Sequence, residues 1–378
     1  MKTNYYKWAA ASAILSLFAM SESHASQHKE YFLYVGVYGN GIYAYHYDAA
    51  TAKLSPLNMV GEVGNPSFLA TDPDFRYLYA ASELEKGEGA VAAFAINRAT
   101  GALTPLNSRP SAGVAPCHLA VDHTAKMLIA ANYTTGGVPS YPIEHDGRLG
   151  NMASLMTASG TGPDKDRQEG PHAHETVFSA DNKFAYVPDL GLDEIRIYRV
   201  EAGTAKLTPN DPPFAKTEPG SGPRHIALSP SGKFAYVIHE LKPQVGVFSR
   251  DSSTGALTLL QTVPSVPDGF TGKADPAEIL IDTAGKFVYA SNRTFGSIAV
   301  FSVDSANGKL TRIQVIKTGG TMPRGVAFDP TGSRLFVGDQ KTNRFIIFQI
   351  DAAGGKLTPT DQSYEVPSPV AFEFVPAK

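Results

Sequence analysis

The sequence predicts an all-β fold, a seven-bladed β-propeller with four antiparallel strands per blade, and two repeated patterns carry this prediction. The first is a turn followed by a leucine that recurs about every 50 residues, at Leu54, Leu103, Leu149, Leu207, Leu257, Leu310 and Leu357. The second is a proline that opens a short apolar run, at Pro66, Pro116, Pro171, Pro223, Pro276, Pro323 and Pro369. Two patterns that agree in number and phase indicate seven copies of one unit.

Each unit consists of short strands. After Pro223, an apolar run over 225–228 is followed by a Ser-Pro-Ser-Gly turn, a second run over 233–237 and an alternating run over 245–248. The run 257–263 adds a fourth. Short β-branched and aromatic runs between Asp, Pro and Gly turns are typical of antiparallel strands. Four strands in about 50 residues describe one propeller blade, so the 35 glycines and 27 prolines mark turns rather than interdomain linkers.

The two ends of the chain are expected to complete one blade together. The last unit, 369–374, provides only the innermost strand, and the N-terminal segments 31–35, 42–45 and the run after Leu54 provide the other three. Pairing these strands closes the ring and removes exposed sheet edges, which promote aggregation.

The first residues predict a cleaved secretory signal peptide. Lys2 and Lys7 precede the uncharged run 8–20, and Ser23-His24-Ala25 places small residues at a cleavage site. We therefore expect a signal peptide over 1–25, one propeller domain over 26–378, and a periplasmic protein if the source is Gram-negative. The apolar run is too short to cross a bilayer, and no later run is long enough, so no membrane insertion is expected.

The composition limits the classes of molecule that this protein is expected to bind. A net charge of −3 argues against nucleic acid or an anionic membrane surface. The single cysteine, Cys117, excludes an intramolecular disulfide and a cysteine-rich zinc site. No residue spacing requires a metal, so we predict neither a metal nor a cofactor, and we expect a monomer.

The motifs within the repeats resemble those of one propeller family. Trp8 is the only tryptophan, which argues against propellers with a tryptophan in every blade. The segments that carry the resemblance are 116–118 (PCH), 170–174 (GPHAH), 188–191 (PDLG), 222–225 (GPRH), 236–240 (YVIHE), 291–293 (SNR) and 319–324 (GGTMPR). They are similar to those of the seven-bladed lactonase propellers, which include bacterial 6-phosphogluconolactonases and the fungal carboxymuconate-cyclising enzyme.

Propeller geometry gathers these motifs at one mouth of the central channel. The start of each innermost strand lies beside the end of the next strand, on the same face of the ring. The residues soon after each blade-opening proline differ from blade to blade: Phe68, His118, His174, His225, Glu278 and Gly325. Variation at one position of a regular repeat indicates a substrate site on a symmetric scaffold.

The resemblance implies the catalytic residues His174, Arg224, Glu240 and Arg293. We expect six further residues to contact the substrate: His118, Asp189, His225, Glu278, Asn292 and Arg324. Arginine binds carboxylate or phosphate, and ester hydrolysis needs an activated water and a stabilised oxyanion. The hypothesis has Glu240 or His174 as base and Arg224 with Arg293 as substrate clamp. Two alternative interpretations remain open. Arg224 and Glu240 form a structural ion pair, and the histidines only cap backbone groups.

Two further features leave alternatives open. Cys117 is not expected to be a nucleophile, because His118 alternates away from it and no other partner is evident. The segment 151–170 leads into the mouth and is either a lid over the substrate or a solvated loop.

These observations predict a lactonase that hydrolyses a sugar lactone or a related anionic lactone, with a small molecule as its partner. The alternatives are a carboxymuconate-type cycloisomerase and a non-catalytic exported propeller that binds a small anion, a glycan or a protein. Export argues against a phosphorylated sugar, which is made in the cytosol.

Overall fold

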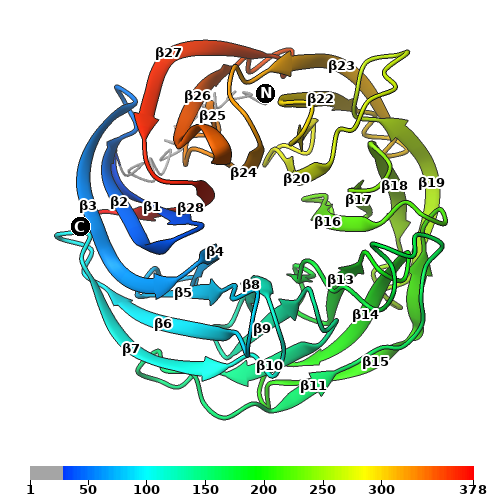
Figure 1. Cartoon of the computed structure of the whole chain (residues 1–378), viewed down its shortest axis with the longest axis horizontal. Helices are drawn as coiled ribbons and strands as arrows, with labels where there is room; N and C mark the ends of the chain where they lie inside the picture. Colours follow the sequence, from blue (N-terminus) through cyan, green and yellow to red (C-terminus); the bar gives the residue numbers. More distant parts are fainter. Residues whose placement is uncertain (1–28) are drawn as a thin grey trace, which may run out of the picture.

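The computed structural model describes residues 29–378 and confirms the predicted fold: a ring of seven four-stranded antiparallel sheets around a central channel (Figure 1). The predicted signal peptide lies outside the described residues. Among residues 29–378 the only helical element is the 3-10 turn Gln340–Thr342. In the same part of the chain, no helix is long and apolar enough to cross a membrane.

The strands of each blade follow one another from the channel outward. The first three blades are β28 (Pro369–Pro376), β1 (Glu30–Val37), β2 (Asn40–Asp48) and β3 (Lys53–Gly64); β4 (Pro66–Thr71), β5 (Tyr77–Ser82), β6 (Ala90–Ile96) and β7 (Leu103–Pro110); and β8 (Pro116–Val121), β9 (Met127–Asn132), β10 (Val138–Pro142) and β11 (Ser154–Met156). The fourth and fifth are β12 (Val177–Phe178), β13 (Phe184–Asp189), β14 (Glu194–Glu201) and β15 (Lys206–Lys216); and β16 (Pro223–Leu228), β17 (Phe234–His239), β18 (Gln244–Arg250) and β19 (Leu257–Pro264). The sixth and seventh are β20 (Pro276–Ile281), β21 (Phe287–Asn292), β22 (Ser297–Val303) and β23 (Leu310–Lys317); and β24 (Pro323–Phe328), β25 (Arg334–Asp339), β26 (Arg344–Ile350) and β27 (Leu357–Glu365).

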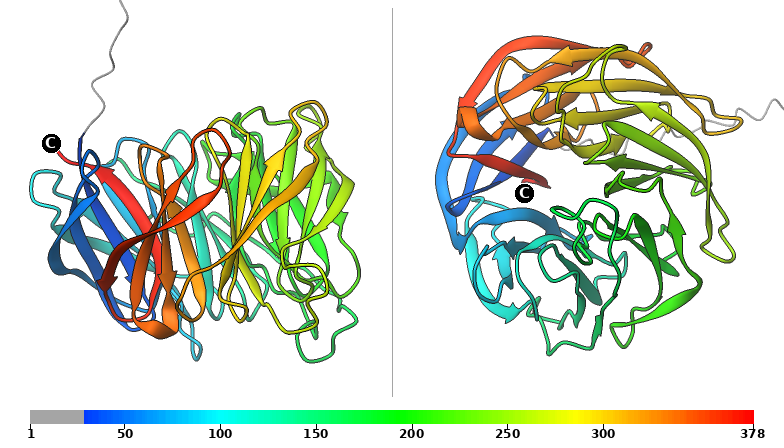
Figure 2. Two further views of the ribbon diagram at one scale, coloured as in Figure 1. Left: turned by 90° about the horizontal axis from the view of Figure 1, so that it is seen from above. Right: turned by 45° about the vertical axis from the view of Figure 1, so that its right-hand side comes forward.

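The first blade closes the ring as predicted. β28 pairs antiparallel with β1, with Leu33 opposite Phe374, and β1 continues the sheet into β2 and β3. In Figure 1 the red β28 lies beside the blue β1. Seen from the side, the strands run between the two faces of the ring (Figure 2). The two faces of the ring are therefore formed by strand ends and loops, where functional side chains can gather.

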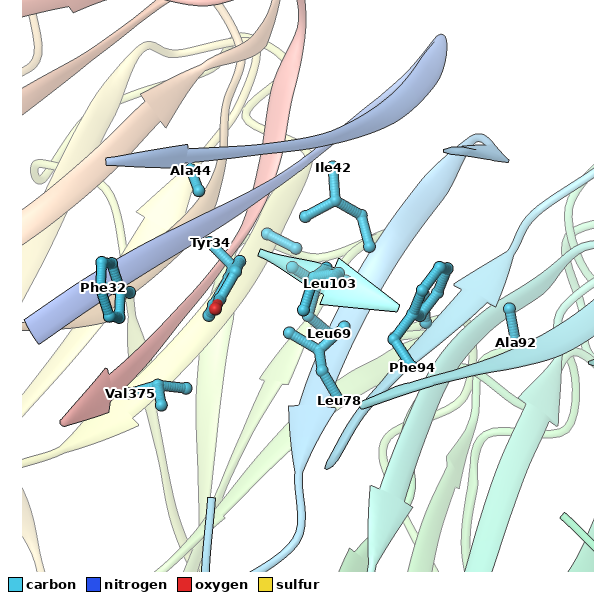
Figure 3. Close-up of a cluster of buried hydrophobic side chains, with 12 residues drawn as sticks. Phe32, Tyr34, Ile42, Ala44, Leu69, Leu78, Ala92, Phe94, Leu103 and Val375 are labelled. Carbon is cyan, nitrogen blue, oxygen red and sulfur yellow. The ribbon is translucent and has the colours of Figure 1, made fainter. Parts of the chain in front are cut away.

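Apolar side chains fill the spaces between neighbouring blades, so each blade buries both of its faces. The cluster between the first two blades contains Phe32, Tyr34, Leu69, Phe94 and Val375, all nearly inaccessible to solvent (Figure 3). Equivalent clusters lie between the other neighbours. Packing between sheets, rather than a single central core, holds the ring together.

A repeated hydrogen bond explains the glycine in the turn-leucine pattern. In four blades a tyrosine of the second strand donates its hydroxyl to the carbonyl of a turn glycine in the next blade: Tyr34 to Gly101, Tyr79 to Gly147, Tyr186 to Gly255 and Tyr289 to Gly355. These glycines have φ between +70° and +83°, a conformation that side chains disfavour. The pattern seen in the sequence therefore marks contacts between blades as well as turns.

Candidate active site

The strand pairing brings the start of each inner strand to the end of its neighbour, as expected. Pro116 lies opposite Asn132, Pro223 opposite His239, and Pro276 opposite Asn292. The side chains that follow these paired positions meet at one mouth of the channel. We call the following eight residues the mouth ring: His174, Arg224 and Arg324 after the inner-strand starts, and Tyr38, Glu83, Tyr133, Glu240 and Arg293 after the second-strand ends.

Glu240 is the centre of a charge cluster in the mouth ring. Its Oε2 accepts a hydrogen bond from Arg224 Nε at 2.9 Å and lies 2.8 Å from Arg293 Nη2. Its Oε1 accepts from Arg167 Nη2 at 2.5 Å. Arg167 also donates to the Tyr133 hydroxyl at 3.0 Å. Three guanidinium groups from three different segments therefore share one buried carboxylate.

The cluster fixes Glu240 as an anion. Burial alone would raise the pKa of the Glu240 carboxyl, but Arg293, Arg224 and Arg167 together hold that pKa well below its ordinary value. Burial lowers the pKa of Arg224 to about 10, with Arg293 and Arg324 adding to the effect, so Arg224 remains protonated at neutral pH. Because guanidinium groups occupy both oxygens of this carboxylate, neither oxygen is free to take a proton from water, which disfavours Glu240 as the general base.

Arg324 forms a second cationic point in the mouth ring. Its Nη2 lies 3.6 Å from Glu83 Oε2, and its guanidinium carbon lies 4.9 Å from the centre of the Tyr38 ring. Tyr38 donates its hydroxyl to the same Glu83 oxygen at 2.7 Å. With Arg167 and the cluster around Glu240, the mouth holds four arginines and two carboxylates. This excess of positive charge suits an anionic ligand or a developing oxyanion.

His174 is a buried, neutral imidazole in the mouth ring. Burial lowers the pKa of His174 well below its ordinary value, and Arg224, His225 and Arg324 lower it further. Its ring lies edge-on to Tyr133 and to His225, with centroids 5.3 Å and 5.2 Å away. The imidazole of His174 is therefore uncharged at neutral pH, whereas both carboxylate oxygens of Glu240 are held by arginines, so His174 is the candidate base of the mouth ring.

Cys117 has a partner that the sequence did not reveal. Its Sγ lies 3.6 Å from His174 Nδ1 and 3.2 Å from the His174 carbonyl oxygen. Burial raises the pKa of the Cys117 thiol, so the thiol stays protonated and is a poor nucleophile. If the thiol donates to the carbonyl, its sulfur can accept the Nδ1 proton of His174. That arrangement leaves Nε2 of His174 free to act as a proton acceptor.

A second set of residues lies deeper in the channel. Phe68 stacks on His118 with ring centroids 3.6 Å apart, and His225 Nδ1 lies 2.8 Å from Glu278 Oε1. His118 Nε2 lies 3.4 Å from Glu175 Oε1. We call His118, Glu175, His225 and Glu278 the inner ring. The channel holds a cavity of about 780 Å³, lined by three inner-ring residues and by Thr71, Phe328 and Glu373 among others.

The structure corrects the position assigned to His174. Ala173 forms an isolated bridge with Asp189, as Pro116 pairs with Asn132, so Ala173 and not Pro171 takes the position of the blade-opening proline, ahead of β12. Glu175 therefore occupies the position of His118 and His225, and His174 occupies that of Arg224. The sequence prediction placed His174 in the deeper set because this blade carries extra residues between its proline and its inner strand.

Asp189 and Asn292 lie away from the mouth. Both are fully buried. Asp189 Oδ1 accepts from the backbone N–H groups of His172 and Leu192, and Asn292 donates to the Ser265 carbonyl while accepting from the Ser265 hydroxyl. Each is the last residue of its strand, and its side chain hydrogen-bonds to residues of the neighbouring loops. The residue that follows each strand end faces the mouth instead, as Glu240 and Arg293 do.

The sequence prediction missed four residues at the mouth. Tyr38, Glu83 and Tyr133 follow second-strand ends in the first three blades, so the rule that selected Glu240 and Arg293 would have found them if it had been applied to every blade. Arg167 gave no such signal, because its segment has no counterpart in the other blades. The structure places the segment 151–170 against the mouth through Arg167, which favours the lid over a solvated loop.

Replacing Arg167 by alanine is expected to raise KM about tenfold and to leave stability nearly unchanged. The side chain is 34% exposed, so its ion pair contributes little to folding, whereas a charge-assisted hydrogen bond at the mouth is worth about one decade of affinity. Steady-state kinetics and thermal unfolding measure the two effects. Lys165→Ala, at an exposed position of the same segment, is the control. An unchanged KM in Arg167→Ala would show that the segment does not close on the substrate.

Comparison with known proteins agrees with this fold. The family described as "Lactonase, 7-bladed beta-propeller" matches residues 32–374. The 6-phosphogluconolactonase of Bacillus subtilis is 35% identical over 298 residues, covering 78% of this chain and 84% of that protein. A putative 6-phosphogluconolactonase from Bacteroides fragilis is 35% identical, with a TM-score of 0.87 and coverage of 93% and 99%. The periplasmic gluconolactonase PpgL of Pseudomonas aeruginosa is 32% identical, with a TM-score of 0.87 and coverage of 92% and 100%.

The chain therefore belongs to the seven-bladed β-propeller lactonase family. It is a lactonase, a hydrolase that opens a lactone ring, and the names of its relatives favour this activity over cyclisation or a purely binding role. The resemblance stated from the sequence is confirmed over nearly the whole described chain.

Proposed function

We propose that this protein hydrolyses the ring ester of a sugar lactone that carries no phosphate, in the periplasm. The excess of guanidinium groups at the mouth, next to a neutral buried histidine, is the observation that carries the proposal. The similarity to a periplasmic gluconolactonase supports both the substrate class and the compartment. The predicted signal peptide supports the compartment independently, and N-terminal sequencing of the exported protein checks cleavage after Ala25.

The mouth ring supplies the groups that the reaction needs. A water molecule held near Nε2 of His174 loses its proton to that nitrogen as its oxygen bonds to the lactone carbonyl carbon. Negative charge then develops on the former carbonyl oxygen. The ring C–O bond breaks next, and the leaving ring oxygen takes the proton back from His174. The product is a hydroxy acid, which ionises at neutral pH.

Arg224 and Arg293 are placed to stabilise the oxyanion. Arg224 donates from Nε to Glu240 and from Nη1 to the carbonyl of Ala277 at 2.7 Å. Among residues 29–378, its Nη2 has no hydrogen-bond partner. Arg293 donates from Nε to the Asp275 carbonyl, and its Nη2 forms an ion pair with Glu240. Glu240 thus orients both arginines, while their remaining N–H groups are available to the substrate. Preorganised donors of this kind contribute most when charge appears in the transition state.

Arg324 and the inner ring bound the rest of the substrate site in this proposal. Arg324 reaches the mouth beside Glu83 and Tyr38 and can bind a hydroxyl or an acidic group of the sugar. His118, His225 and Glu278 form the floor beneath the mouth. A sugar lactone presents several hydroxyl groups, which need both donors and acceptors, and the carboxylates and imidazoles of the site provide both.

The proposal is tested by following acid release from purified protein with glucono-δ-lactone and with 6-phosphogluconolactone, after subtraction of spontaneous hydrolysis. We expect turnover of the unphosphorylated lactone with a kcat/KM at least equal to that of the phosphorylated one. A carboxymuconate assay is the control for cyclisation. The absence of enzymatic acid release with both lactones would overturn the proposal, and a clear preference for the phosphorylated lactone would overturn its substrate assignment.

A further inference from the structure

The inner ring has a geometry that neither the proposed proton transfer nor the oxyanion stabilisation requires. Glu175, His225 and Glu278 come from three neighbouring blades, and one donor atom from each lies within 4.8 Å of the other two. His225 Nδ1 is 2.8 Å from Glu278 Oε1 and 3.9 Å from Glu175 Oε1. Ligand atoms about 2.1 Å from a tetrahedral cation lie about 3.4 Å apart, so small side-chain shifts bring these three atoms into coordination.

Backbone contacts aim the carboxylates at one point. The N–H of Ile226 donates to Glu175 Oε2, which leaves Oε1 directed at the cluster. The N–H of Ile279 donates to Glu278 Oε1 at 3.1 Å and holds that side chain against His225. All three side chains are at most 11% exposed. The donors are therefore positioned by the inner strands rather than gathered on a mobile surface.

His118 supports this set from outside. Its Nδ1 accepts from the backbone N–H of Thr176 at 3.4 Å, so its proton resides on Nε2. That nitrogen lies 3.4 Å from Glu175 Oε1 and faces it. A histidine that orients a ligating carboxylate is a recurrent second layer of protein metal sites.

The carboxylates of the inner ring are buried, and the neighbouring guanidinium has other partners. Arg224 precedes His225 in the chain, but it donates to Glu240 and to the Ala277 carbonyl. Two buried carboxylates side by side are costly unless a positive charge joins them.

We propose that Glu175, His225 and Glu278 bind one divalent cation in the channel, with His118 orienting Glu175. One imidazole nitrogen and two carboxylate oxygens suit a first-row transition ion such as Zn²⁺, Mn²⁺ or Co²⁺. Glu175 and Glu278 also line the cavity of about 780 Å³ on the far side of the channel, which provides a path of entry away from the mouth. The ion ties three blades together and takes no part in the proposed hydrolysis.

The test uses purified protein without an affinity tag, treated with a chelator and then titrated with Co²⁺ and with Zn²⁺. We expect visible ligand-field absorption of bound Co²⁺ at one ion per chain, and displacement of Co²⁺ by Zn²⁺. Glu175→Gln and Glu278→Gln are expected to weaken binding at least 100-fold, and His118→Ala about 10- to 100-fold. The matched control is Glu373→Gln. Glu373 is a channel carboxyl that accepts from the Thr71 hydroxyl at 2.7 Å, outside the inner ring.

The wild-type titration can overturn the proposal by itself, so the proposal stays testable even if a variant fails to fold. Folded wild-type protein that shows neither Co²⁺ bands nor heat with Zn²⁺ at about 1 mM overturns it. Unchanged affinity in both glutamine variants also overturns it, because the ion then binds elsewhere. The lactonase assay is a separate measurement: loss of the proposed function with cation binding intact leaves this inference standing.

Discussion

Replacing His174 by glutamine is expected to lower kcat for lactone hydrolysis by about 10²–10⁴-fold, with a much smaller change in KM. Burial keeps the His174 imidazole uncharged at neutral pH, whereas three arginines hold Glu240 as an anion and occupy its oxygens. Glutamine keeps most of the volume and polarity but cannot take the proton. Initial rates of acid release, corrected for spontaneous hydrolysis, measure the effect.

The pH dependence gives the same prediction in a second form. Because burial lowers the pKa of His174, its active neutral form persists below pH 6.5, and the wild-type kcat/KM is expected to fall only at more acidic pH. This limb should disappear from the residual activity of His174→Gln. The control is His123→Gln, at an exposed histidine near the opposite end of the channel. A His174→Gln enzyme within threefold of wild type would exclude His174 as the base.

Replacing Glu240 by glutamine is expected to cost about 3–5 kcal/mol of folding stability and at least 100-fold in kcat/KM. The carboxylate is 6% exposed and is the shared counter-charge of Arg224, Arg293 and Arg167. Its loss leaves buried guanidinium groups without a partner and releases the two arginines that face the substrate. Denaturant unfolding and steady-state kinetics at neutral pH measure the two losses.

The stability loss in Glu240→Gln has a defined pH window. The folded-state pKa of Glu240 lies below its ordinary value of 4.5, so its contribution to stability is complete above pH 4.5 and is lost as the pH falls through the folded-state pKa. The difference between wild type and variant should therefore shrink in acid. Glu83→Gln, which removes a carboxylate 3.6 Å from one arginine across the mouth, should cost less. Equal unfolding free energies for wild type and Glu240→Gln at neutral pH would contradict the shared-counter-charge interpretation.

The repeats could be predicted from the sequence because every blade has the same local structural requirements. A turn glycine, a leucine and a blade-opening proline recur because every sheet needs tight turns and two buried faces. The same regularity predicted that strand ends share one mouth, which placed Arg224, Glu240 and Arg293 together correctly. The match of these residues to a lactonase pattern then depended on motifs of a few residues, which survive in the sequence without any knowledge of the fold.

The register of the fourth blade and the contacts between distant segments could not be predicted from the sequence, for physical reasons. In the fourth blade Ala173 takes the position of the blade-opening proline, and only its bridge to Asp189 reveals that Glu175 belongs to the inner ring. Arg167 lies far along the chain from Glu240, so nothing local indicates that they touch. The contact between Cys117 and His174 likewise joins two blades.

The sequence by itself therefore determined the seven-fold propeller, the mouth that carries the site and most of its charged residues, because these follow from local patterns repeated in every blade. The tertiary structure alone decided which carboxylate is pinned as an anion, which histidine is left neutral and which residues form the inner ring. Those properties depend on burial and on distances between blades, and a linear sequence records neither.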